Sequence, residues 1–115
     1  MTARVFIPNV SAERNAEGVA TVRDYTPAAQ YGELVEVFPR RPLHGDGGIL
    51  MREVAEKVKE FTDADYVVAT GDPAVIAAVV MEAAYQNRGR VKLLRWSRLE
   101  RCYAMIQLDT LEERI

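Results

Sequence analysis

The chain has very little cysteine, histidine or tryptophan, with one of each in 115 residues. Its single cysteine, Cys102, cannot close an internal disulfide, and its place in an alternating apolar run indicates a buried thiol in a reducing compartment. A lone His44 beside one carboxylate does not make a metal site, because such sites need three or four ligands at suitable spacing. We therefore expect no disulfide framework, no bound metal and no cofactor.

Long hydrophobic runs are also absent. The longest, Pro73 to Met81, has the length of a core helix and falls short of the roughly 18 residues that cross a membrane. The first ten residues, MTARVFIPNV, lack the apolar core and the cleavage site of a signal peptide. These features predict a cytoplasmic protein that makes no membrane contact.

Neither sign of charge is in excess. The 15 basic and 17 acidic residues give a net charge of -2, so any contact with a phosphate or nucleic acid must come from a local patch. A chain of 115 residues is long enough for one hydrophobic core but not for two. We expect a single domain over residues 1–115.

The polar and apolar pattern predicts an α/β fold. Strands are expected at residues 4–10, 33–38, 66–70, 90–96 and 101–108, and helices at 49–61 and 73–88. We expect a long loop or a loose ribbon at residues 11–24. Residues 26–32 should form a single helical turn capped by Thr26. Pro8 suggests that its strand lies at a sheet edge or ends there. Crossover helices favour parallel pairing, so the expected fold is one mixed β-sheet of about five strands with two main helices and a C-terminal β-hairpin.

Thr70, Gly71 and Asp72 stand where a strand meets a helix. Asp72 suits the N-cap, Pro73 suits the first helical position, and Gly71 allows a tight turn. The same geometry also suits a ligand, because a helix N-terminus at the carboxyl end of a parallel strand presents free N–H groups. The Asp72 carboxylate would compete with a phosphate for those donors. A purely structural turn and a ligand held near Thr70 and Gly71 both remain open.

The helix after this turn is unusually apolar. From Ala74 to Ala84 only Glu82 is charged, which is typical of a helix covered on more than one side. A homodimer or a docked partner would cover it, with Val75, Val79 and Met81 at the interface. Alternatively, its small alanine face tolerates solvent.

A basic segment follows. It holds six of the 15 basic residues: Arg88, Arg90, Lys92, Arg95, Arg98 and Arg101. On a strand, Arg90, Lys92 and Trp96 share one face and Arg95 lies on the other. Two cations and an indole on one face can hold phosphates and stack a base, as in proteins that bind single-stranded nucleic acid. The alternative is a solvated face whose arginines protect an edge hairpin from aggregation.

His44 opens a glycine-rich loop, His44-Gly45-Asp46-Gly47-Gly48, directly before a helix. The loop is either a flexible surface segment or one that closes over an anionic ligand. No catalytic triad or phosphate-loop motif is present, so we assign no catalytic residue. An enzyme would require His44 and Asp72 to converge.

Two resemblances rest on these residues. The run DYVVATGDPAVIAAVVMEAAYQNRGRVKLLRW, followed by YAMIQLD and preceded by YGELVEVFP, resembles a group of small uncharacterised proteins of tailed bacteriophages. The order of elements is also similar to the viral anti-CRISPR ring nucleases, which are dimeric and cleave cyclic oligoadenylates. Asp72 stands where the catalytic histidine of that family would, so the resemblance does not imply this activity.

The leading hypothesis is a small phage-type accessory protein that acts by binding, as a homodimer. Its ligand would be a nucleotide-like molecule, a single-stranded nucleic acid or a host protein. The alternatives are an enzyme that acts on a nucleotide or phosphodiester, and a structural or assembly component of a virion.

Overall fold

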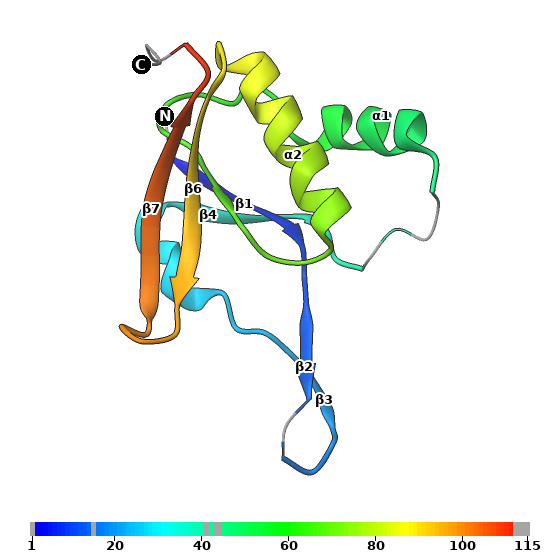
Figure 1. Cartoon of the computed structure of the whole chain (residues 1–115), viewed down its shortest axis with the longest axis vertical. Helices are drawn as coiled ribbons and strands as arrows, with labels where there is room; N and C mark the ends of the chain where they lie inside the picture. The colour runs from blue at the N-terminus through cyan, green and yellow to red at the C-terminus, as the bar shows by residue number, and fades with distance from the viewer. Residues whose placement is uncertain (1, 15, 41, 43–44, 112–115) are drawn as a thin grey trace.

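The computed structural model describes residues 2–14, 16–40, 42 and 45–111. A five-stranded sheet runs through the molecule in the order β4-β1-β5-β6-β7 (Figure 1). Its strands are β1 (Arg4–Asn9), β4 (Glu33–Phe38), β5 (Tyr66–Val68), β6 (Arg90–Ser97) and β7 (Cys102–Asp109). The first four pair in parallel, and β7 closes an antiparallel hairpin with β6. The predicted mixed α/β sheet with a C-terminal hairpin is confirmed.

The position of β1 differs from the prediction drawn from Pro8. This strand is internal, because β4 pairs with one side of it and β5 with the other. The pairing of β1 with β5 ends at Phe6, opposite Val67. Pro8 lies beyond it, so β5 does not need the backbone N–H that a proline lacks. A proline is therefore tolerated near the end of an interior strand.

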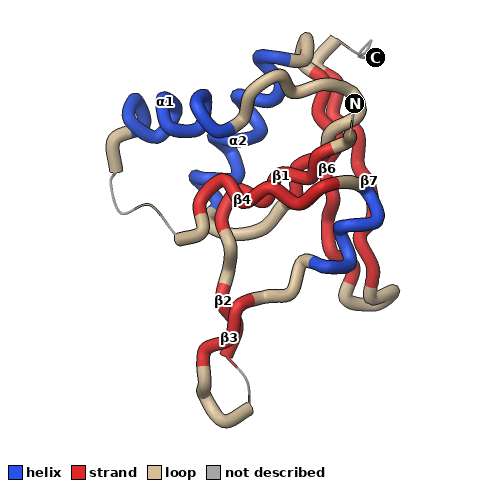
Figure 2. Tube along the Cα trace, turned by 180° about the vertical axis from the view of Figure 1, so that it is seen from behind, coloured by secondary structure: helices blue, strands red, loops and turns tan. Residues whose placement is uncertain are grey.

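The two faces of the sheet are covered by different elements. On one face, α1 (Gly47–Lys57) and α2 (Pro73–Gln86) pack over a core that includes Phe6, Val67 and Val91. On the other face lies the short 3-10 helix η1 (Thr26–Tyr31), where Tyr25 and Ala28 pack against Val5, Ile7, Val68 and Leu94. Figure 2 shows the helices and η1 on opposite sides of the sheet.

Local signals set where the helices begin and end, and α1 and η1 differ from what was expected. The helix α1 begins after Asp46, whose carboxylate accepts from Gly48 N and Ile49 N. It ends at Lys57 rather than Phe61, because the backbone is extended at Val58 and has a φ of 57° at Glu60. This change of direction places the side chains of Val58 and Phe61 in the core. At η1 the side chain of Asp24, not that of Thr26, accepts the hydrogen bonds that fix the first turn.

Two short strands, β2 (Ala12–Arg14) and β3 (Ala20–Val22), form an antiparallel ribbon that projects away from the sheet (Figures 1 and 2). This is the loose ribbon that the polar stretch predicted. Val19 and Val22 on it are exposed. The base of the ribbon leads directly from β1 to Arg23 and η1.

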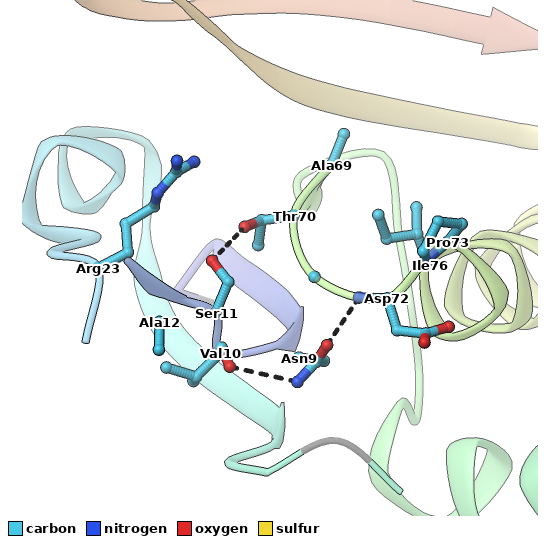
Figure 3. A pocket seen from close by; sticks show the side chains of 11 residues that line it. Asn9, Val10, Ser11, Ala12, Arg23, Ala69, Thr70, Asp72, Pro73 and Ile76 are labelled. Atoms are coloured by element: carbon cyan, nitrogen blue, oxygen red, sulfur yellow. Dashed lines mark hydrogen bonds between the residues drawn. The ribbon is translucent and has the colours of Figure 1, made fainter. Parts of the chain in front are cut away.

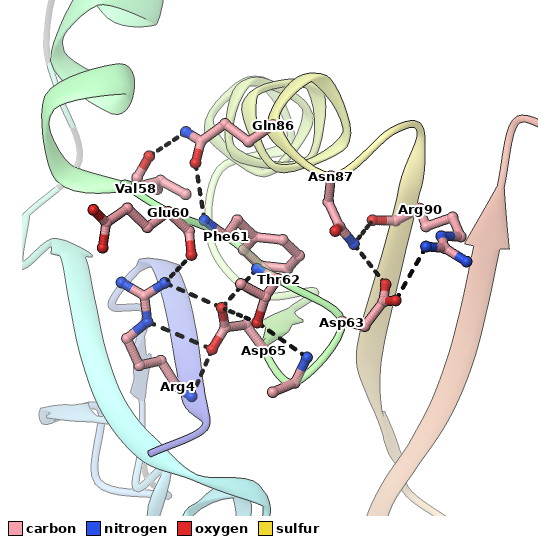
Figure 4. Close-up of polar contacts among 11 residues, drawn as sticks. Arg4, Val58, Glu60, Phe61, Thr62, Asp63, Asp65, Gln86, Asn87 and Arg90 are labelled. Carbon is pink, nitrogen blue, oxygen red and sulfur yellow. Dashed lines mark hydrogen bonds and ion pairs between the residues drawn. The ribbon is translucent and has the colours of Figure 1, made fainter. Parts of the chain in front are cut away.

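At the amino ends of the strands, a polar network holds the layers together (Figure 4). Asp65 is 2% exposed and accepts from the backbone N–H groups of Arg4 and Thr62 and from the Arg4 guanidinium. Gln86 at the end of α2 accepts from Phe61 N and donates to Val58 O. Nearby, Asp63 forms an ion pair with Arg90 at 3.1 Å. These contacts fix the loop before β5 to β1, α2 and β6.

Within the described part of the chain, no helix has both the length and the apolar character needed to cross a membrane.

Candidate functional site

The strand order creates a crevice between the carboxyl ends of β1 and β5. From β1 the chain crosses through η1 on one face to reach β4, and from β5 it crosses through α2 on the other face to reach β6. The two connections leave neighbouring strands in opposite directions. In open α/β sheets such a switch point is where ligands bind.

An open cleft with a volume of about 620 Å³ occupies this position. The segment 9–12, which starts at the last residue of β1, lines one side, and the segment 69–73 after β5, with Ile76, lines the other. Arg23, which follows the ribbon, completes the wall (Figure 3). The cleft therefore combines the predicted Thr70, Gly71 and Asp72 with groups that are far from them in sequence.

Three hydroxyl groups meet at the base of the cleft. The Tyr25 Oη lies 2.9 Å from both Ser11 Oγ and Thr70 Oγ1, and it accepts a hydrogen bond from Ser11 N. A phenol oxygen donates one proton, so it donates to one of the two smaller hydroxyls and accepts from the other. The hydroxyl that accepts from Tyr25 keeps its own proton, which it can donate to the other hydroxyl at 3.4 Å or to a ligand.

Gly71 and Asn9 hold the two walls together. Asn9 Oδ1 accepts from Asp72 N at 2.7 Å, and Asn9 is 5% exposed. Gly71 has a φ of 102°, and a Cβ there would lie 2.5 Å from Asn9 Oδ1 and 2.6 Å from Asn9 O. The turn passes so close to β1 that only glycine fits without displacing it.

Asp72 acts as the N-cap of α2. Its carboxylate accepts from Ala74 N at 2.8 Å, and Figure 3 shows it directed away from Ser11 and Thr70. The carboxylate therefore occupies Ala74 N, one of the helix N-terminal donors that a phosphate would need, as the sequence predicted, but it lies away from the hydroxyl cluster. Pro73 occupies the first helical position, as predicted.

We expect Asp72→Ala to lower the free energy of unfolding by about 1 kcal/mol, because Ala74 N loses its acceptor. Asp72→Ser should recover most of that loss, since serine also caps helices. Urea denaturation of the three proteins measures both effects. Equal stability of the alanine variant and the wild type would show that the cap contributes nothing.

A second, smaller hollow of about 260 Å³ adjoins the first through Arg23. Its other lining residues are Asp24, Trp96 and Tyr103. The rings of Trp96 and Tyr103 are 5.0 Å apart at 70°, an edge-to-face pair that fixes the indole. Burial and then the neighbouring Tyr25 raise the pKa of the Tyr103 hydroxyl, and the Arg23 charge opposes them. Arg23 thus lies within electrostatic range of both hollows.

Comparison with known families finds a match to the Phage Pam3 gp32-like protein family over residues 3–110. The chain belongs to this family. It is therefore a phage-type protein, as the resemblance to phage proteins implied. Comparison with curated proteins and with solved structures finds no match. The similarity in element order to the viral ring nucleases stays a prediction.

The basic residues predicted to bind phosphates are divided between the two ends of β6 in this gp32-like fold. Arg90 lies at the amino end, where it pairs with Asp63, and Lys92 lies over the Tyr66 ring at 4.1 Å. Trp96 lies at the carboxyl end, beside the cleft edge, roughly 20 Å from Arg90 at the rise of a strand. Arg95 is exposed. Only Trp96 of this set lines a hollow next to the candidate site.

The predicted dimer interface needs a correction. Val75 and Val79 are 2% and 0% exposed and belong to the core beneath α2, because the helix turns them toward the sheet. They present no surface to a partner. Met81, at 63%, and Tyr85, at 86%, are the large exposed apolar side chains of this helix.

His44 lies outside the described residues, so its distance from Asp72 stays a matter of prediction. Among the described residues, no group of three or more histidine, cysteine, aspartate or glutamate side chains is arranged to hold a metal ion.

Four residues of the site were missed from sequence: Asn9, Ser11, Arg23 and Tyr25. Asn9 ends the apolar strand β1 and Ser11 follows it, and polar residues at this place are a usable signal once β1 is known to adjoin β5. Arg23 and Tyr25 follow the ribbon, a segment with no periodic pattern. Only the tertiary contact of Tyr25 with Thr70 identifies them.

Proposed function

We propose that this phage protein is an accessory protein that acts in the host cytoplasm by binding a small phosphate-bearing, nucleotide-like ligand at the β1/β5 switch point. The observation that carries the proposal is the open cleft lined by the Ser11 and Thr70 hydroxyls and by Arg23. Its place at the carboxyl ends of parallel strands is where α/β sheets bind such ligands.

The cleft offers the donors that a phosphate needs. The arginine guanidinium provides several N–H groups and a positive charge, which suit phosphate oxygens. The hydroxyl cluster adds a rotatable O–H, and Tyr25 holds it in place from the buried side. Because Asp72 points toward α2, its negative charge is directed away from this donor set.

The hollow beyond Arg23 suits the base of a nucleotide. Trp96 is partly exposed there and is supported by Tyr103, so that an aromatic ring can stack on or against the indole. A ligand with its phosphate in the cleft and its base near Trp96 would pass over Arg23, which lines both hollows. Single-stranded nucleic acid is a weaker candidate, since Arg90 lies at the other end of β6, roughly 20 Å from Trp96 at the rise of a strand.

Binding is favoured over catalysis because the described lining of the cleft contains two titratable residues, Arg23 and Asp72. An arginine stays protonated in proteins and serves poorly as a general base. Asp72 serves as the helix cap. A catalytic role would need a further group, for which His44 is the sequence-based candidate.

The test is titration of the protein with ATP, AMP and inorganic phosphate, followed by calorimetry and amide chemical shifts. We expect saturable binding by the wild type and a loss of roughly 10-fold to 100-fold in affinity for Arg23→Gln, which removes a charged hydrogen bond. Thr70→Val should also weaken binding. Trp96→Leu should weaken ATP and AMP while leaving inorganic phosphate unchanged.

Arg98→Gln is the matched control, because Arg98 is an exposed arginine in the β6–β7 turn. It carries the same change of charge outside the cleft. Equal affinity of Arg23→Gln and Arg98→Gln would place any bound ligand elsewhere on the protein. No saturable binding by the wild type at millimolar ligand would overturn the proposed function.

A further inference from the structure

The last strand of the sheet, β7, is an open edge. Among the described strands it pairs with β6 alone, and Figure 1 shows it at the outer margin of the sheet. It is eight residues long, and Met105 and Leu108 on it are 48% and 41% exposed. A long edge strand that has no strand on its outer side can pair readily with another strand.

The backbone of β7 directs alternate residues toward and away from β6. Thr110 N donates to Gly89 O, so the even-numbered residues of the strand face β6 in the alternation of an antiparallel ladder. The N–H and C=O groups of Tyr103, Met105 and Gln107 therefore point outward. Tyr31 Oη donates to the outward Tyr103 O at 3.3 Å, which agrees with this orientation and leaves that carbonyl a second lone pair.

The central part of the edge lacks the charges and prolines that keep edge strands apart. From Cys102 to Leu108 it contains no charged residue and no proline. The arginines expected to protect the hairpin lie instead on β6 and in the turn, with Arg90 and Lys92 on the inner strand. The charges of the edge itself are confined to its two ends, Arg101 before β7 and Asp109 at its last residue.

The geometry points to a second copy of this chain as the occupant of the edge, paired antiparallel along β7. A two-fold axis at Met105 places Arg101 of each copy opposite Asp109 of the other, so both ends of the pair carry opposite charges. The same register sets Tyr103 opposite Gln107, and both residues have outward N–H and C=O groups. The two five-stranded sheets then continue as one sheet of ten strands, with a self-complementary interface.

Equilibrium sedimentation of the wild type and edge variants tests this pairing. The wild type should form a dimer in the micromolar range, and Met105→Lys should raise the dimer dissociation constant tenfold or more, because the two lysines would face each other at the axis. Leu99→Lys is the control, since Leu99 is 93% exposed in the turn and outside the paired residues. A monomeric wild type, or a dimer that survives Met105→Lys but not Met81→Lys, would overturn the proposal.

A charge-reversal cycle tests the register. Arg101→Asp and Asp109→Arg should each weaken the dimer, and the double variant should restore it. Arg101 has a φ of 54°, a conformation that aspartate tolerates better than most residues. Failure of the double variant to recover would overturn the register.

Hydrogen exchange supplies a readout that does not depend on variants. The outward amides of Met105 and Gln107 should be protected in the wild-type dimer and should exchange quickly once dilution separates the copies. Fast exchange of both amides in a protein shown to be dimeric would exclude β7 as the interface.

Discussion

Replacement of Asp65 by alanine is expected to lower the free energy of unfolding by about 3 kcal/mol, in the range for breaking a buried ion pair. The carboxylate is 2% exposed, and it accepts hydrogen bonds from the backbone and side chains of both Arg4 and Thr62. Its removal leaves the Arg4 and Thr62 N–H groups without their acceptor. The Arg4 side chain is 27% exposed and also donates to Glu60 O, so the guanidinium retains some compensation.

Chemical denaturation at neutral pH measures this loss. Asp63→Ala is the matched control, because Asp63 lies in the same loop and also pairs with an arginine, but its side chain is 61% exposed. Exposed pairs contribute about 0–1 kcal/mol, so the control should lose much less stability. Equal losses in the two variants would show that burial of Asp65 does not matter.

The contribution of Asp65 should also depend on pH. Burial raises the pKa of its carboxyl, but hydrogen bonds from Arg4 and Thr62 and the Arg4 charge outweigh burial and hold the pKa below the ordinary value of 3.8. A carboxyl with a lowered folded-state pKa stabilises the protein above its unfolded-state value, and this stabilisation is lost as pH falls through the folded-state pKa. The stability difference between the wild type and Asp65→Asn should therefore stay constant above about pH 5 and shrink below about pH 4. A difference that does not change down to about pH 2 would contradict the pairing.

Replacement of Gly71 by alanine is expected to destabilise the protein by about 3 kcal/mol and to distort the cleft. A left-handed φ at a residue with a side chain costs about 1–3 kcal/mol. In addition, the new Cβ would lie 2.6 Å from the backbone oxygen of Asn9, which cannot move without shifting β1. Binding of the proposed ligand should weaken in parallel, because this contact joins the two walls of the cleft.

Gly18 provides the control that separates the two costs. It has a φ of 79°, but an added Cβ would have no atom within 4 Å. Gly18→Ala should therefore show the conformational cost alone, about 1 kcal/mol. Thermal or urea unfolding of both variants gives the comparison. A Gly71→Ala variant no less stable than Gly18→Ala would contradict the close approach of the turn to β1.

The polar network and the cleft lie at opposite ends of the same strands. Asp65 comes just before β5 and anchors its amino end to β1, and Asn9 joins the carboxyl ends of the same two strands through Asp72 N. The Asp65 contacts fix the two strands relative to each other, and the Asn9 contact can then hold the walls of the cleft in register. Loss of Asp65 should therefore reduce ligand affinity only to the extent that the protein unfolds.

The sequence by itself determined the features that depend on neighbours along the chain. Alternation and helical periodicity predicted the five main strands and both helices, because side-chain direction repeats every two residues in strands and about every 3.6 in helices. Gly71, Asp72 and Pro73 predicted the start of α2 for the same reason, since cap and turn chemistry acts over three or four residues. The approximate extent of each element follows from these local rules.

Only the tertiary structure decided which distant residues meet. Ser11 and Thr70 are 59 positions apart in the sequence, and Tyr25 and Thr70 are 45 positions apart. The three residues meet because β1 and β5 are neighbouring strands, and the segments that follow these two strands run over opposite faces of the sheet. The same order places Arg90 and Trp96 at different ends of β6, and it leaves β7 as an open edge. Strand order depends on how whole faces pack against helices, and no short sequence pattern encodes that.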